Sequence, residues 1–197
     1  SVPNLIMLGG GAYFYEDITI TQSFWWISGH IYGDAIVTCN PLAHLVEDGG
    51  SASYTSCKFD FLGGADWTSG NYVINANGQF NFPYGADFKI NLNSAGEIKT
   101  GSGTPYGTIN LSPESILEKT GSGIATLMVV LNSTESDILV QGGGLNLWRG
   151  THKDSYLSIG SGLVVQCTNV GILFDHCNIT GLGTLRETGF YSNIISG

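Results

Sequence analysis

Glycine clusters recur along this chain at nearly constant spacing, and this recurrence limits the possible folds more than any other feature. Marking the last glycine of each cluster gives intervals of 21, 18, 20, 21, 18 and 21 residues. A repeat of 20 to 50 residues is the signature of solenoids and related arrays, in which each repeat is one supersecondary unit. The marked residues are Gly64, Gly85, Gly103, Gly123, Gly144, Gly162 and Gly183.

The segments between the glycine clusters resemble one another. An apolar, β-rich run follows a cluster, as at 124–130, and a second short strand comes just before the next cluster, as at 137–140. Such a layout predicts two strands for each coil. Stacked coils satisfy each other's backbone hydrogen bonds, and glycine suits the corners because it accepts positive φ. The sequence therefore predicts an all-β fold, a single-stranded parallel β-helix (β-solenoid) with roughly 20-residue coils.

The repeat is clear in only part of the chain. Residues 57–197 carry the coils, whereas residues 1–56 read as a less regular N-terminal β segment or cap. Strand-like runs at 5–8, 18–21, 24–27 and 35–38 would supply two or three further coils plus an aromatic cap at the end of the stack. An atypical terminal coil is common in solenoids, since the end must be protected from edge pairing. We expect one continuous domain.

Composition excludes several classes of partner. The 197 residues include only seven lysines and arginines, and the net charge is −9. Nucleic acids and anionic membrane surfaces require a cationic footprint, so neither is an expected partner. No apolar run reaches the roughly 18 residues of a membrane span, so we expect no membrane insertion. Glycans, cations and protein surfaces remain as partners.

Two stretches resemble coils of the right-handed parallel β-helix proteins, the group that holds pectate-lyase-like enzymes and viral tailspikes. They are Asp137-Ile138-Leu139-Val140-Gln141-Gly142-Gly143 and the segment 169–181, and the resemblance covers about residues 57–197. It implies a right-handed coil. It also implies either a polysaccharide lyase or hydrolase, or a trimeric attachment spike. The motifs are typical of the architecture and do not specify an activity.

One acidic residue precedes the second strand of each repeat. Carboxylates one coil apart would be close enough to raise one another's pKa, to share a Ca²⁺ ion, or to act as a general acid and base. The alternative is a solvated turn position that favours acids. If the protein is an enzyme, the catalytic set is Glu135, Asp154 and Asp175, with His152 or His176 nearby. The complete column is Glu97, Glu114, Glu135, Asp154 and Asp175.

Three tryptophans are candidates for ligand binding. Trp25 and Trp26 lie in an aromatic run near the N-terminus, and Trp148 lies in a later coil. Exposed aromatic rings stack on the apolar faces of sugars, whereas the alternative for the N-terminal pair is burial.

Four cysteines show no C-x-x-C spacing, so they do not predict a zinc site. Two local disulfides are one interpretation, pairing Cys39 with Cys57 and Cys167 with Cys177. Four buried thiols in core positions are the other.

Two hypotheses for function follow. The first is a structural or attachment domain of an extracellular or virion surface fibre, which binds glycan or protein surfaces and forms a homotrimer. The alternative is a polysaccharide lyase or glycoside hydrolase of the pectate-lyase-like type. The absence of a catalytic motif favours the first. We expect no cofactor, and Ca²⁺ is the one ion that the acid column would hold.

Overall fold

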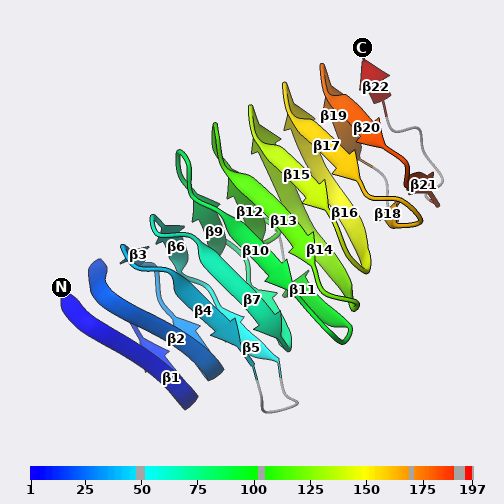
Figure 1. Ribbon diagram of the computed structural model, residues 1–197. Helices are drawn as coiled ribbons and strands as arrows, with labels where there is room; N and C mark the ends of the chain where they lie inside the picture. Colours follow the sequence, from blue (N-terminus) through cyan, green and yellow to red (C-terminus); the bar gives the residue numbers. More distant parts are fainter. Residues whose placement is uncertain (48–51, 102–104, 169–170, 189–193, 197) are drawn as a thin grey trace.

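The computed structural model is a β-solenoid, and it describes residues 1–47, 52–101, 105–168, 171–188 and 194–196. Its 22 strands form one continuous sheet in which every pairing is parallel, and the described residues contain no helix. The strands stack along one axis, so the two termini lie at opposite ends of the rod (Figure 1). The predicted fold class is therefore confirmed.

Each coil contributes to three columns of stacked strands, rather than to the two that the sequence predicts. The first column holds β3 (Ile36–Cys39), β6 (Lys58–Phe61), β9 (Gln79–Phe82), β12 (Thr108–Leu111), β19 (Ile172–Asp175) and β22 (Ile194–Ser196). The second column holds β4 (Ala43–Val46), β7 (Ala65–Ser69), β10 (Phe88–Asn91), β13 (Ile116–Thr120), β15 (Asp137–Val140), β17 (Tyr156–Ile159) and β20 (Asn178–Gly181).

The third column holds β5 (Ser53–Thr55), β8 (Asn71–Ile74), β11 (Gly96–Thr100), β18 (Val164–Cys167) and β21 (Thr184–Glu187). Four long strands bend across corners and serve more than one column. They are β1 (Val2–Tyr13), β2 (Ile18–Tyr32), β14 (Ile124–Thr134) and β16 (Gly144–Lys153). The apolar run at 124–130 belongs to β14, which bends across a corner and pairs with β11 in the third column and with β12 in the first. Because such a strand reads as one run in the sequence, the sequence predicts two strands in each coil and not three.

The coil length agrees with the sequence period, apart from one longer coil. Along the first column Ile36 pairs with Lys58, Lys58 with Gln79, Gln79 with Thr108, and Thr108 with Val130. The partners are 22, 21, 29 and 22 residues apart. The offset rises from 21 residues at Lys58–Gln79 to 23 at Ala65–Phe88, 26 at Asn71–Glu97 and 29 at Gln79–Thr108, so the additional residues of this coil are spread over its three corners.

The marked glycines do not all occupy the same corner. Gly64 and Gly85, with φ of 82° and 71°, precede second-column strands, whereas Gly123 and Gly162 precede third-column strands. Gly103 lies outside the described residues. The glycine period is therefore correct, but the marks shift from one corner of the coil to another.

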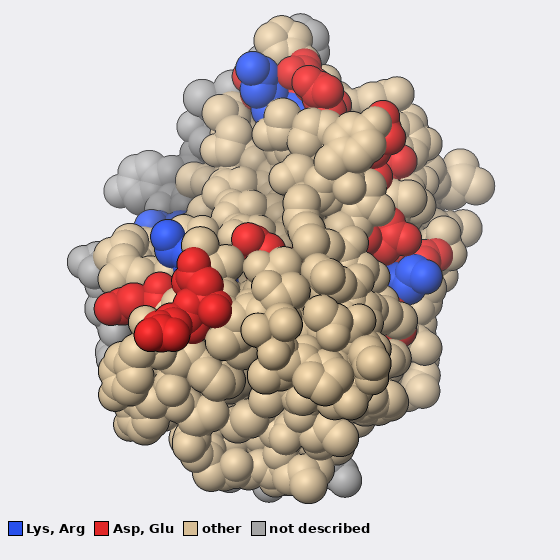
Figure 2. Space-filling model, turned by 90° about the vertical axis from the view of Figure 1, so that its left-hand side faces the viewer, with Lys and Arg blue, Asp and Glu red and all other residues tan. Residues whose placement is uncertain are grey.

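The first third of the chain joins the same stack. β1 pairs with β2 along its whole length with three register shifts, and β2 pairs with β3, β4 and β5 in turn. This region is irregular in having long bent strands and bulges, and its strands are coils of the solenoid. Figure 2 views the end formed by β1, where a broad area carries no acidic or basic side chain.

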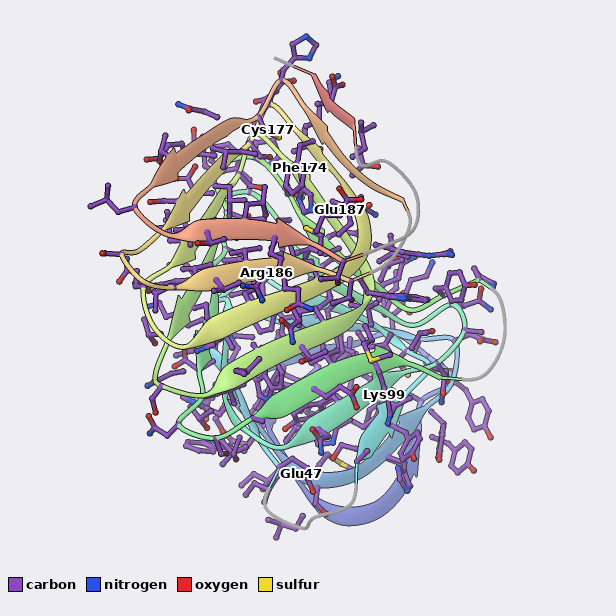
Figure 3. All side chains as sticks on the ribbon, turned by 90° about the vertical axis from the view of Figure 1, so that its right-hand side faces the viewer. Glu47, Lys99, Phe174, Cys177, Arg186 and Glu187 are labelled. Carbon is purple, nitrogen blue, oxygen red and sulfur yellow. The ribbon has the colours of Figure 1, made fainter. Side chains whose placement is uncertain are left out.

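Alternate residues of each strand point inward and fill the core, as the repeated buried and half-buried pattern of the strands shows. Seen from the C-terminal end, the strands enclose an interior packed with side chains, including Phe174 (Figure 3). In the N-terminal half this interior is aromatic: Phe59 stacks on Trp26 and on Phe61, each at a centroid distance of 5.6 Å. Within the described residues, no helix could cross a membrane.

Candidate functional site

The acid column is a real structural feature, but its membership differs from the prediction. Glu114, Glu135 and Asp154 occupy equivalent positions at the corner between the first and second columns, and His176 takes the next position. All four have positive φ, between 47° and 61°. Backbone hydrogen bonds link the corner from coil to coil, for example from Glu114 N to Glu135 O at 2.9 Å.

Two of the five predicted acids lie elsewhere. Asp175 precedes the corner position by one residue, because the coil before it is longer, so His176 stands above Asp154. Glu97 lies in the third column, on β11, where it forms an ion pair with Lys99 at 3.3 Å. The structure thus brings together Glu135, Asp154 and the Asp175–His176 pair, whose Oδ1 and Nδ1 are 2.9 Å apart.

The acidic and imidazole side chains at this corner face solvent. Glu114, Glu135, Asp154 and His176 are all exposed, and a corner of the coil turns outward into solvent. Among the described residues, no group of three or more His, Cys, Asp or Glu side chains is placed to hold a metal ion. The left-handed backbone and the solvent exposure of these residues agree with the alternative of a turn position that favours acids.

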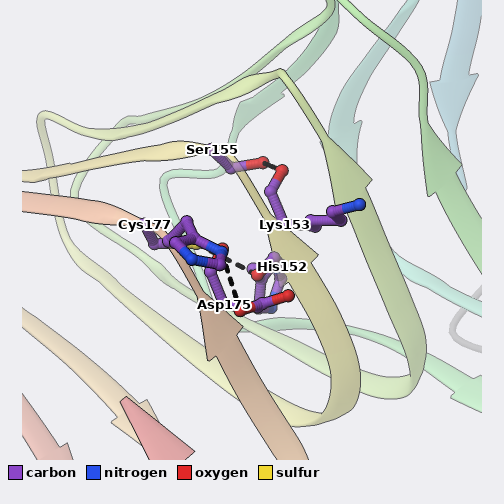
Figure 4. Close-up of polar contacts among 6 residues, drawn as sticks. His152, Lys153, Ser155, Asp175 and Cys177 are labelled. Atoms are coloured by element: carbon purple, nitrogen blue, oxygen red, sulfur yellow. Dashed lines mark hydrogen bonds and ion pairs between the residues drawn. The ribbon is translucent and has the colours of Figure 1, made fainter. Parts of the chain in front are cut away.

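A buried polar cluster lies inside the same corner. Ser133 Oγ is 2.7 Å from His152 Nδ1 and 3.0 Å from Ser155 Oγ. Cys177 Sγ donates to His152 O at 3.0 Å (Figure 4). Burial lowers the pKa of His152 to about 4, because a charged imidazolium would lose its hydration. The His152 ring is 1% exposed, so this serine–histidine contact has no access for a substrate.

The three candidate tryptophans have three different environments. Trp26 is fully buried in the core, where its Nε1 donates to Gly29 O at 3.2 Å, so its prediction as a ligand-binding residue is wrong. Strand alternation separates it from Trp25, which is 38% exposed and stacks on His44 at 4.0 Å. Trp148 is half-buried at the corner between the third and first columns.

All four cysteines are free thiols. Cys39 pairs with Phe61, and Cys57 lies four residues earlier, which is about 13 Å along the strand direction. Disulfide geometry requires Cα atoms within roughly 7 Å, so this pair is too far apart. Cys167 lies in the third column and Cys177 precedes the second-column strand β20, so the other local pair is also separated.

A ladder of side-chain amides runs along the outer face of the first column. Asn81 Nδ2 donates to Asp60 Oδ1 at 2.8 Å, Asn110 Nδ2 to Asn81 Oδ1 at 2.8 Å, and Asn132 Nδ2 to Asn110 Oδ1 at 3.0 Å. At the end of the ladder, Thr151 N donates to Asn132 Oδ1 at 3.3 Å. These bonds hold one polar side chain per coil in a fixed orientation.

A pocket lies beside this ladder, at the corner between the third and first columns. Its volume is about 320 Å³, near the lower limit of ligand sites. It crosses four consecutive coils, since Asp34 precedes β3 and the other lining residues lie on or before β6, β9 and β12. The lining residues are Asp34, Ser56, Lys58, Asn77, Gln79, Pro105, Tyr106 and Thr108.

An aromatic cluster adjoins the pocket. The Tyr106 ring meets the Trp148 ring edge to face at 5.1 Å, and Arg149 Cζ lies 4.8 Å from the centre of each ring. Such cation–π contacts hold the three side chains together. Lys58 and Arg149 belong to neither of the two ion pairs among the described residues.

The first-column face therefore has three parts: the amide ladder in its middle, the pocket at one edge and the acid column at the other. Sequence reasoning missed the ladder and the pocket. A signal existed in the motif of an apolar residue on each side of an amide, as in Phe80-Asn81-Phe82 and Ile109-Asn110-Leu111. It was hidden by the 29-residue coil, which breaks the spacing between these two motifs.

The chain was compared with protein-family models, with curated proteins and with solved structures, and none of the three comparisons finds a significant match.

Proposed function

We propose that this solenoid is a rigid attachment domain of an extracellular or virion surface fibre, and that it binds glycans through the outer face of its first column. The observation that carries the proposal is the amide ladder from Asp60 to Asn132. A row of carboxamides, each fixed by its neighbour, offers donors and acceptors to hydroxyl groups without the entropy cost of ordering free side chains.

Charge supports a glycan over other polymers. The net charge of −9 and the seven cationic side chains disfavour nucleic acids and anionic membranes. The described outer face combines amides and hydroxyls with charged side chains of both signs, the cations Lys58, Arg149 and Lys153 and the carboxylates Asp60 and Asp175. Aromatic rings at one edge add the apolar contact that sugar faces require.

The test is binding to a broad glycan array, together with the mass in solution. We expect glycan binding that is lost in Asn110→Leu, since this change interrupts the ladder and inserts an apolar side chain. A matched change on the third column, Asn146→Leu, should leave binding intact. A folded monomer that binds no glycan would overturn the proposal, and binding to protein surfaces alone would replace its ligand class.

The second candidate function is polysaccharide cleavage, which rests on Glu135, Asp154 and the Asp175–His176 pair at the opposite edge of the same face. Reducing-sugar release and unsaturated-product absorbance on neutral and acidic polysaccharides would test it. Activity that Asp154→Asn and Asp175→Asn abolish would favour this function. Activity that survives both changes would eliminate these residues.

A further inference from the structure

The pocket beside the ladder has an elongated arrangement of polar groups that points to a particular ligand. Lys58, Gln79 and Thr108 are register partners on successive coils, and Ser56, Asn77 and Tyr106 each lie two residues earlier on the same coils. Three ladder steps, from the coil of Asp34 to that of Thr108, span about 14 Å along the axis. A ligand that contacts all four coils must therefore extend along the rod.

The lining carries no net charge. Asp34 and Lys58 have opposite charges, and the other polar lining residues are neutral hydroxyls and amides. The chain as a whole is acidic, with a net charge of −9. A polyanion would be repelled over the range of a Debye length, about 10 Å at moderate salt. The charge pattern favours an uncharged chain with many hydroxyl groups.

The aromatic cluster supplies a fixed apolar wall. Tyr106 lines the pocket and is held at 5.1 Å from Trp148 and at 4.8 Å from the Arg149 guanidinium carbon. Because Arg149 packs on two rings and joins neither ion pair of the described residues, its contacts support the Tyr106 ring. A held ring loses little conformational freedom when a sugar stacks on it.

We infer that this pocket binds an uncharged polysaccharide that lies parallel to the solenoid axis, with Tyr106 as the stacking platform. This inference rests on the proposed glycan-binding function and adds its ligand class and its site. The hydroxyl and amide groups of Ser56, Asn77, Gln79 and Thr108 would bond the sugar hydroxyls, one coil after another.

The test begins with an array of neutral and acidic oligosaccharides as probes, followed by calorimetry on the neutral probe that binds best. We expect neutral probes to bind, with a Kd that changes less than about twofold between low and high NaCl, since screening acts on charged pairs. Tyr106→Ala should weaken binding about tenfold, the effect of one aromatic contact. Tyr106→Phe should keep the affinity within about threefold, because stacking does not need the hydroxyl.

The matched control is Tyr84→Ala, which removes an exposed tyrosine near the acid column at the other edge of the face. It should leave the affinity unchanged, and circular dichroism checks that each variant folds. If acidic probes alone bind, or if Tyr84→Ala weakens binding and Tyr106→Ala does not, the inference fails while the proposed function stands. If no probe binds, both fail.

Discussion

From β2 to β10 the interior of the solenoid is rich in aromatic rings, whereas from β13 to β19 it is aliphatic apart from Phe174 and includes a buried lysine and a buried histidine. Phe59 has four ring neighbours, Phe24, Trp26, Phe61 and Phe80, at centroid distances of 5.6 to 5.8 Å. In the second region, Lys119, Ser133 and His152 are at most 1% exposed. One backbone plan thus accommodates two kinds of core.

The polar interior is tolerated because neighbouring coils supply partners. Lys119 Nζ donates to Gly121 O at 3.1 Å, to Gly142 O on the next coil at 3.2 Å, and to Thr120 O. Burial lowers the pKa of Lys119, and the carbonyl groups partly replace its lost hydration. A stacked coil has to match its two neighbours, so core chemistry can change along the rod while the backbone stays the same.

The largest expected effect is on the aromatic core. Phe59→Ala should lower the free energy of unfolding by about 3–5 kcal/mol, because it removes a ring with four aromatic neighbours and leaves a cavity. Leu157→Ala, a matched truncation in the aliphatic region, should cost less, about 2–3 kcal/mol, since the end coils can relax around it. Urea unfolding measures both, and equal losses would contradict the contrast between the two cores.

The buried histidine should make the second region sensitive to acid. Since the pKa of His152 is about 4 in the folded chain and 6.5 in the unfolded chain, the unfolded state binds more protons between these values. Stability is therefore full above pH 6.5 and falls by about 3 kcal/mol as the pH drops to 4. His152→Gln should remove this part of the pH dependence in urea titrations, and an unchanged profile would refute the assignment.

The amide ladder should contribute a smaller, local stabilisation. Asn110→Ala removes two ladder hydrogen bonds, one to Asn81 and one from Asn132, and should cost about 1–2 kcal/mol. Asn146→Ala removes one bond to Thr126 Oγ1 on the third column and should cost about half as much. Thermal unfolding would measure the pair. Equal costs would mean that the ladder bonds do not act together.

The smallest effect concerns thiol reactivity and involves no change in stability. Cys177 is half-buried, whereas the other three cysteines are buried, and burial raises the pKa of Cys57 and Cys167 to about 11. Since the thiolate is the reactive form, an Ellman reagent should modify Cys177 first in the native protein. Mass spectrometry would identify the site. Modification of Cys39 at the same rate as Cys177 would contradict this prediction, since it would mean that the N-terminal core exposes its thiol as readily as the C-terminal coils do.

The sequence by itself determined the period, the all-β class and the alternation of inward-facing apolar residues. These are local properties, because turn residues and the two-residue strand period can be counted along the chain. It also indicated a corner rich in acids, three members of which, Glu114, Glu135 and Asp154, lie together in the structure.

Only the tertiary structure decided the number of columns, the place of Trp26 in the core, the separation of the cysteines and the contents of the first-column face. Each depends on register between residues about 20 or more positions apart, and a one-residue change in corner length exchanges neighbours, as at Asp175 and His176. The ladder from Asp60 to Asn132 and the pocket lined by Tyr106 exist because parallel pairing aligns side chains whose spacing in the sequence is unequal.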